Sequence, residues 1–225
     1  MTPFAYLHLL FFGAFIPYAS WRTKKRVAGG APRFRTHVQA TLINLTLFGV
    51  FSIIVARIEW IRLFPARVPS LESMGAGVIV LALMIVYMRP RWRRAVEKRA
   101  DILRMFIPRN STERTQWIAV ATLAGISEEI TWRGVQFALL QRLLHNPLLA
   151  AAICALSFAL GHIVQGWRSA IVVFVFAGGF QLLAWLAGSL YVAMTVHLAY
   201  DIVAGLSYSR LARELNYDDI VVTPQ

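Results

Sequence analysis

Long apolar stretches recur along this chain, and they restrict its possible folds more than any other feature of the sequence. Of its 225 residues, 58% are hydrophobic and only 15% are charged. A helix of about 20 apolar residues crosses the roughly 30 Å hydrocarbon layer of a membrane. We therefore expect an all-α, polytopic transmembrane helical bundle with no separate soluble domain. The sequence predicts about seven or eight spans, within residues 3–19, 37–56, 74–88, 116–144, 147–164, 169–187 and 189–207.

The stretch at residues 116–144 is the least regular of these predicted spans. At about 1.5 Å per residue, it is longer than one straight crossing requires. We expect it to be tilted, broken near Gly125, or divided into two pieces. The first stretch is followed directly by WRTKKR and has no small-residue cleavage site, so we interpret it as a retained helix rather than a signal peptide.

The net charge of +12 comes from basic residues that lie between the predicted spans. Residues 20–36 contain six Lys or Arg side chains and no acid, and RPRWRRAVEKR opens the connection at residues 89–115. The positive-inside bias predicts that both loops are cytoplasmic, so the N-terminus and the loop at residues 57–73 are expected outside. Membrane topology and attraction to anionic lipid explain this charge better than nucleic-acid binding does, and we expect no nucleic-acid partner.

Six ionisable residues stand out inside the predicted spans, where each costs a few kcal/mol unless it is paired or hydrated. Helices of a bundle can combine such residues into one site, so we treat them as the candidate functional site. They form three groups on three different spans: Glu128, Glu129 and Arg133; His162; and His197 with Asp201.

The two adjacent glutamates are expected to differ in role. Glu129 and Arg133 are four residues apart with the acid first, which is the favourable order for an ion pair on a helix. Glu128 points about 100° away and shares its face with Trp132. An unpaired carboxylate beside an apolar ring suits a general base. The alternative is a purely structural role, in which these side chains only hold neighbouring helices together, and it applies above all to Glu129 and Arg133.

The histidines lie in two short motifs. His162 ends FALGH, one helical turn after Phe158, and the side chains of His197 and Asp201 in HLAYD fall on one helical face. A single buried histidine is more often structural than catalytic. Polar groups on three separate spans favour a shared site.

In order along the chain, EEITWR, FALGH and HLAYD resemble the EExxxR, FxxxH and HxxxN/D motifs of the CPBP family of intramembrane endopeptidases, also called Abi. This family includes the type II CAAX prenyl proteases, and the resemblance covers roughly residues 116–207. It implies an all-helical membrane fold and a glutamate-dependent hydrolysis without a metal or other cofactor.

The resemblance also implies roles for the motif residues. Glu128 matches the base that activates water, and His162 matches the residue that helps to hold that water. Glu129 and Arg133 match supporting positions. The two residues of the third motif, His197 and Asp201, match the pair that stabilises the oxyanion.

Asp201 departs from the pattern, because the prenyl proteases of the family carry asparagine there, although aspartate occurs among bacterial relatives. An ionised carboxylate only accepts hydrogen bonds, so it cannot stabilise an oxyanion directly. Asp201 is either protonated or acts by orienting and charging His197, and we favour the second role.

These features predict an endopeptidase that hydrolyses a peptide bond in a membrane-associated or lipidated protein or peptide. Its expected partners are that substrate and the lipid bilayer of the bacterial inner membrane; the sequence does not indicate an oligomeric state. We expect N-terminal spans with basic cytoplasmic loops at residues 1–115, a catalytic core at 116–208 and a C-terminal tail at 209–225.

Three alternatives use the same residues differently. In a zinc metalloprotease, the two histidines and Glu128 or Asp201 could furnish three ligands and leave one position open, although the chain lacks HExxH. In a proton-coupled transporter, the buried acids and histidines would form a relay. A non-enzymatic membrane protein of the bacteriocin-immunity kind would keep only the fold.

Overall fold

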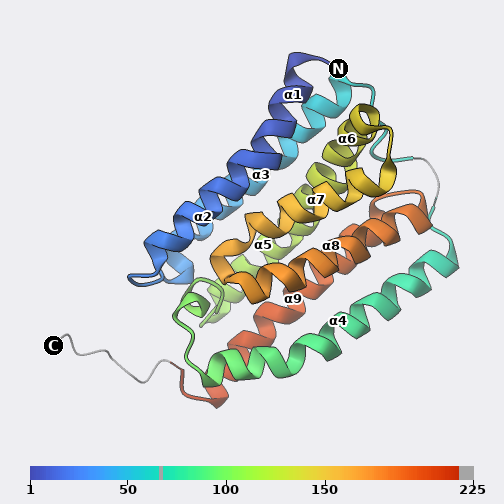
Figure 1. The fold of residues 1–225 in the computed structure, drawn as a ribbon. Helices are drawn as coiled ribbons and strands as arrows, with labels where there is room; N and C mark the ends of the chain where they lie inside the picture. Colours follow the sequence, from blue (N-terminus) through green and yellow to red (C-terminus); the bar gives the residue numbers. More distant parts are fainter. Residues whose placement is uncertain (66–67, 218–225) are drawn as a thin grey trace.

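The computed structural model describes residues 1–65 and 68–217, and all regular structure in these ranges is helical (Figure 1). The all-α membrane bundle predicted from the sequence is therefore confirmed. Seven continuous helical rods form the described part of the chain. The first three are α1–η1–α2 (Pro3–Leu10, Phe11–Phe15, Ile16–Val27), α3 (Phe34–Ile58) and α4 (Leu71–Glu97). After the short 3-10 turn η2 (Asp101–Met105) come α5–η3–α6 (Ser111–Glu128, Glu129–Gln136, Phe137–Leu144), α7 (Pro147–Gly161) with the turn η4 (Ile163–Gln165), α8 (Trp167–Ala187) and α9 (Tyr191–Glu214).

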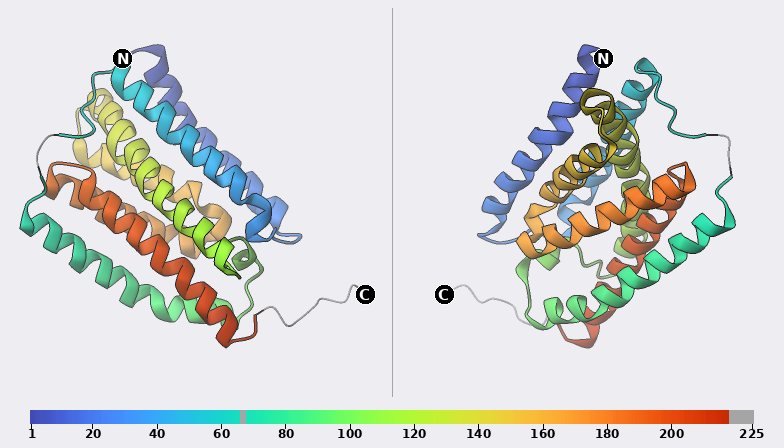
Figure 2. Two further views of the ribbon diagram at one scale, coloured as in Figure 1. Left: turned by 180° about the vertical axis from the view of Figure 1, so that it is seen from behind. Right: turned by 45° about the vertical axis from the view of Figure 1, so that its right-hand side comes forward.

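The rods pack in two layers. Seen from behind, α3, α5, α9 and α4 lie side by side in that order (Figure 2). The second layer consists of α2, α7 and α8, which are also neighbours in that order (Figure 1). Since α8 additionally contacts α9 and α4, residues of α5, α7, α8 and α9 can face one another in the space between the layers.

Four of the rods are long and apolar enough to cross a membrane: Pro3–Val27, Phe34–Ile58, Leu71–Glu97 and Trp167–Ala187. The helix α7 is apolar but shorter. The α5–α6 rod and α9 carry most of the ionisable residues singled out above, which lowers their hydropathy. The protein is thus a membrane protein, and spans beyond these four stay a prediction.

The α5–η3–α6 rod runs without interruption past Gly125, so of the three alternatives for this stretch the break at Gly125 and the division into two pieces are excluded. The irregularity lies a few residues later, where η3 is a π-helix that begins at Glu129. Gly125 instead permits close packing, because a Cβ atom there would lie 2.7 Å from the backbone nitrogen of Leu198 on α9. This contact joins the helix that carries the glutamates to the helix that carries His197.

The expected division of the chain stays a prediction. The helix α9 continues to Glu214, beyond the predicted end of the core at residue 208. Of the expected tail at residues 209–225, residues 218–225 lie outside the described structure.

Candidate active site

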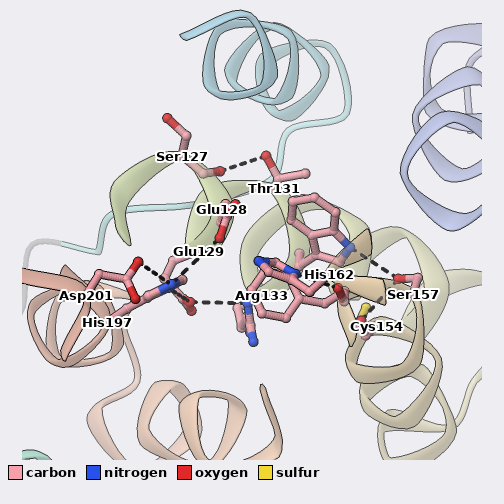
Figure 3. A network of polar contacts seen from close by, with 12 residues as sticks. Ser127, Glu128, Glu129, Thr131, Arg133, Cys154, Ser157, His162, His197 and Asp201 are labelled. Carbon is pink, nitrogen blue, oxygen red and sulfur yellow. Dashed lines mark hydrogen bonds and ion pairs between the residues drawn. The ribbon is translucent and has the colours of Figure 1, made fainter. Parts of the chain in front are cut away.

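The structure brings five of the six candidate residues into one polar cluster between the two layers, with His162 beside it (Figure 3). At its centre is His197, which is buried on α9. Its Nδ1 lies 2.8 Å from Oε1 of Glu129, and its Nε2 lies 3.7 Å from Oε2 of Glu128. Oδ2 of Asp201 is 3.6 Å from the same Nε2. The ring of Phe180 stacks on the imidazole with centroids 4.8 Å apart.

Glu129 is completely buried and joins two of the candidate groups. Its Oε1 contacts His197 and also lies 3.2 Å from Nη1 of Arg133, so the ion pair expected within the rod is present. The guanidinium of Arg133 lies over the ring of Phe158 at 4.2 Å. Because an ionised carboxylate only accepts, Nδ1 of His197 donates to Glu129. This bond fixes the ring and turns Nε2 towards the other two carboxylates.

Glu128 faces a different environment from its neighbour. The side chain of Glu128 is 14% exposed, whereas that of Glu129 is fully buried. Glu128 also lines a cavity of about 940 Å³. Trp132, the expected apolar neighbour, packs against Phe12 and Phe158 and donates from Nε1 to Oγ of Ser157. The two adjacent glutamates are thus separated into one buried, paired acid and one acid in contact with the cavity.

His162 is the C-cap residue that directly follows α7, and it lines the same cavity. Its Nδ1 lies 2.9 Å from the carbonyl oxygen of Phe158. A carbonyl oxygen accepts only, so Nδ1 donates this bond, and Nε2 carries a lone pair whenever the ring is neutral. His162 is therefore oriented by its own helix, with a hydrogen-bond acceptor available for a molecule in the cavity.

The π-helix that carries Glu129 and Arg133 is held by a buried chain of polar contacts that the sequence analysis missed. The hydroxyl of Thr131 donates to the carbonyl oxygen of Ser127 at 2.7 Å and lies 2.9 Å from Oγ of Ser52 on α3. That oxygen is in turn 3.0 Å from Nε2 of His8 on α1. The signal in the sequence was His8 itself, a histidine within the first apolar stretch.

The cavity opens away from the polar cluster, towards one end of the bundle. Along α9 it extends from His197 to Tyr208, which corresponds to about 16 Å of helix. Its far end is lined by four cationic residues, Arg91, Arg94, Lys98 and Arg168, which we call the basic mouth. Arg91, Arg94 and Lys98 lie in the stretch at residues 89–115 that the sequence predicts to be cytoplasmic, and Arg168 lies at the start of α8.

In the described ranges, no group of three or more His, Cys, Asp and Glu residues is arranged as a metal site. One nitrogen of His197 is engaged by Glu129, and one nitrogen of His162 by a backbone carbonyl. The expectation of hydrolysis without a metal stays a prediction, which chelation can test.

The site lies within a segment that matches a known family. Residues 110–203, from the start of α5 into α9, match the family described as Type II CAAX prenyl endopeptidase Rce1-like. This part of the chain is therefore similar to an Rce1-like domain. This match agrees with the resemblance of the three motifs and includes all six candidate residues. It spans somewhat less than half of the chain, and neither the curated proteins nor the solved structures contain a significant match.

The Rce1-like domain supports CAAX-type intramembrane protease activity in general. Proteases of this type are hydrolases that act on membrane-associated protein substrates. The match does not assign a role to any single residue. Those roles depend on the geometry described above.

Proposed function

We propose that this protein is an intramembrane glutamic endopeptidase in which Glu128 activates the attacking water. The observation that carries this proposal is the separation of the two adjacent acids. Glu128 lines the cavity, whereas Glu129 is fully buried and engaged by His197 and Arg133. A general base must reach both water and substrate, and Glu128 meets that condition.

In the proposed reaction, Glu128 takes a proton from water as the water oxygen attacks the carbonyl carbon of the scissile peptide bond. The π electrons of the carbonyl move to its oxygen and form the oxyanion. When the oxyanion collapses, the C–N bond breaks and Glu128 returns the proton to the leaving nitrogen. The products are an amine and a carboxylic acid. His162 assists by accepting a hydrogen bond from the water at Nε2.

His197 is proposed to stabilise the oxyanion by donating from Nε2. Glu129 positions this donor, because it holds Nδ1 on the opposite side of the ring. With its side chain 3.6 Å from Nε2, Asp201 complements a positive charge on the imidazole without donating a hydrogen bond of its own. Donors arranged in advance around a developing negative charge commonly contribute about 100- to 1000-fold in rate.

We further propose that the protein is a multi-pass protein of the bacterial inner membrane with its basic mouth in the cytoplasm. The positive-inside bias supports this orientation, because the mouth residues adjoin the two most basic loops. In this arrangement, the substrate reaches Glu128 from the cytoplasmic side. The N-terminal rods would enclose the catalytic core.

The test is cleavage of a prenylated CAAX peptide, and of its unprenylated counterpart, by the purified protein in proteoliposomes. Glu128→Gln keeps the shape of the side chain but removes the base, so we expect cleavage to fall by about 100- to 10,000-fold with no change in unfolding temperature. Glu72→Gln, which changes an exposed acid at the start of α4, is the control and should cleave normally. Undiminished cleavage by Glu128→Gln would exclude the proposed base. A wild-type protein that cleaves neither peptide but conducts protons would favour the alternative of a proton-coupled transporter.

A further inference from the structure

The cavity has opposite charges at its two ends. Within the described structure, the acids that line it are Glu128 and Asp201, and both lie at the inner end with His197. The four cationic residues of the basic mouth line the outer end. A water-filled cavity between low-dielectric walls focuses such a field and concentrates ligands of the opposite charge.

Three of the mouth residues are available for a ligand. Arg94, Lys98 and Arg168 are exposed, and none of them has an ion pair or a side-chain hydrogen bond in the part of the chain that the structure describes. Nearby arginines differ. Arg93 pairs with Glu97 at 2.9 Å, and Arg99 donates to the backbone carbonyls of residues 216 and 217.

Positive-inside bias alone does not explain this arrangement. That bias requires basic residues at one end of the helices, but it does not require them to line a cavity. Arg89 on α4 satisfies it from an exposed position that does not line the cavity. The orientation of Arg94, Lys98 and Arg168 towards the space that leads to Glu128 therefore needs a further reason.

The spacing along α8 sets the distance from the mouth to the site. Arg168 precedes Phe180 by twelve residues, which corresponds to about 18 Å of helix, and Phe180 stacks on His197. An extended peptide advances about 3.3 Å per residue. A peptide bond held beside His197 would thus place a residue about five positions away near the basic mouth.

We propose that the basic mouth selects peptides that carry a carboxylate about five residues from the scissile bond, on the side that faces the mouth. This inference rests on the proposed function and adds a substrate class to it. The carboxylate is either an acidic side chain or the end of the chain. Arginine binds it through two parallel hydrogen bonds, while Glu128 and Asp201 repel it from the inner end. Together these charges fix the direction in which the peptide enters.

The experiment uses fluorogenic peptides of one sequence in proteoliposomes of phosphatidylcholine, which carries no net charge. One peptide is neutral, one has Glu in place of Gln five residues after the cleaved bond, and one has Glu five residues before it. A fourth ends in a free carboxylate about five residues after that bond, whereas the others end in an amide. We expect kcat/KM to be about tenfold higher than for the neutral peptide when the negative charge lies on the side of the cleaved bond that faces the mouth. A charge on the opposite side should give no increase.

Variants of the mouth then identify the groups responsible. Arg94→Gln with Arg168→Gln should reduce the ratio between anionic and neutral peptides to about one, and Arg94→Glu with Arg168→Glu should favour a Lys-containing peptide instead. The control Arg89→Gln removes one positive charge from α4 outside the cavity, so it should leave the ratio unchanged. Added salt should lower the ratio in the wild type.

Binding to the Glu128→Gln protein separates this inference from the proposed function, because binding needs no cleavage. Fluorescence anisotropy should give about tenfold tighter binding of the anionic peptide, lost in the Arg94→Gln and Arg168→Gln background. Equal affinity for all four peptides would overturn the inference, whether or not cleavage depends on Glu128. It would also be overturned if phosphatidylglycerol, rather than peptide charge, controlled binding through these arginines, because the mouth would then be a lipid site.

Discussion

At the scale of single residues, the buried pair of Glu129 and Arg133 supports the rest of the cluster. Their side chains are 0% and 2% exposed, and Glu129 also holds His197. Burial of an ion pair removes both charges from water, so loss of one partner leaves the other uncompensated. The pair therefore couples the stability of the fold to the position of the imidazole.

Arg133→Ala should lower the free energy of unfolding by about 3–5 kcal/mol, since it leaves the buried Glu129 carboxylate without its guanidinium partner. The chain supplies a matched control in Arg93, which forms the same i,i+4 pair with Glu97 but is 59% exposed. Arg93→Ala should cost less than about 1 kcal/mol. Denaturant unfolding in detergent micelles measures both values. Similar losses for the two variants would contradict the stabilising role of the buried pair.

Asp201 separates a metal-free from a metal-dependent reaction. If it supports His197 indirectly, Asp201→Asn should lose less than about tenfold in kcat/KM, because the amide supplies a hydrogen-bond donor. His197→Ala should lose about 100- to 1000-fold, as expected for removal of an oxyanion donor. A metal ligand at position 201 would behave differently: activity would collapse in the asparagine variant, return in part with added zinc, and disappear from the wild type on prolonged chelation.

At the scale of elements, the crossing of α5 and α9 determines whether the two halves of the cluster meet. Gly125 lies at this crossing, three residues before Glu128, and it faces the backbone of Leu198, the residue after His197. The absence of a side chain at residue 125 allows the approach. A second contact joins the same two helices about two helical turns before Gly125 on α5. There, Nε1 of Trp117 donates a hydrogen bond of 2.8 Å to the carbonyl oxygen of Asp201 on α9.

Gly125→Ala should therefore be harmful although alanine favours helices. Its Cβ would lie under 3.0 Å from backbone atoms of Leu198, so α9 must shift, at a cost of about 1–3 kcal/mol. Since His197 moves with α9, we also expect kcat to fall. Gly178→Ala in α8 meets nothing within 4 Å and should instead stabilise the protein by up to about 1 kcal/mol. Unfolding and peptide cleavage, measured on both variants, compare the two sites.

Helical periodicity explains which parts of the site the sequence could predict. The spacing of four residues correctly indicated that Glu129 would reach Arg133 and that His197 would lie near Asp201, because both pairs are within one helix. It could not indicate the bond between Glu129 and His197, which depends on how closely two rods pack. For the same reason, the chain of contacts from His8 to the π-helix was not predicted.

At the scale of the whole molecule, the two ends of the bundle differ in charge and in access to the site. The cavity that contains Glu128 leads to the end where the basic mouth lies. The other end carries the N-terminus and the end of α3 (Figure 1). In a membrane, water and substrate would thus reach Glu128 from one side, and the positive-inside bias predicts that this side is the cytoplasm.

Labelling of single cysteines tests this orientation on one helix. Leu71 and Lys98 lie at opposite ends of α4, separated by about 40 Å of helix, and both are exposed. The native Cys154 is buried and can be replaced by alanine, which leaves each introduced cysteine as the only thiol. With a membrane-impermeant maleimide, we expect Leu71→Cys to react in intact spheroplasts and Lys98→Cys to react in inverted membrane vesicles. The reverse pattern would place the basic mouth outside the cell, and the proposed route of the substrate to Glu128 would then be wrong.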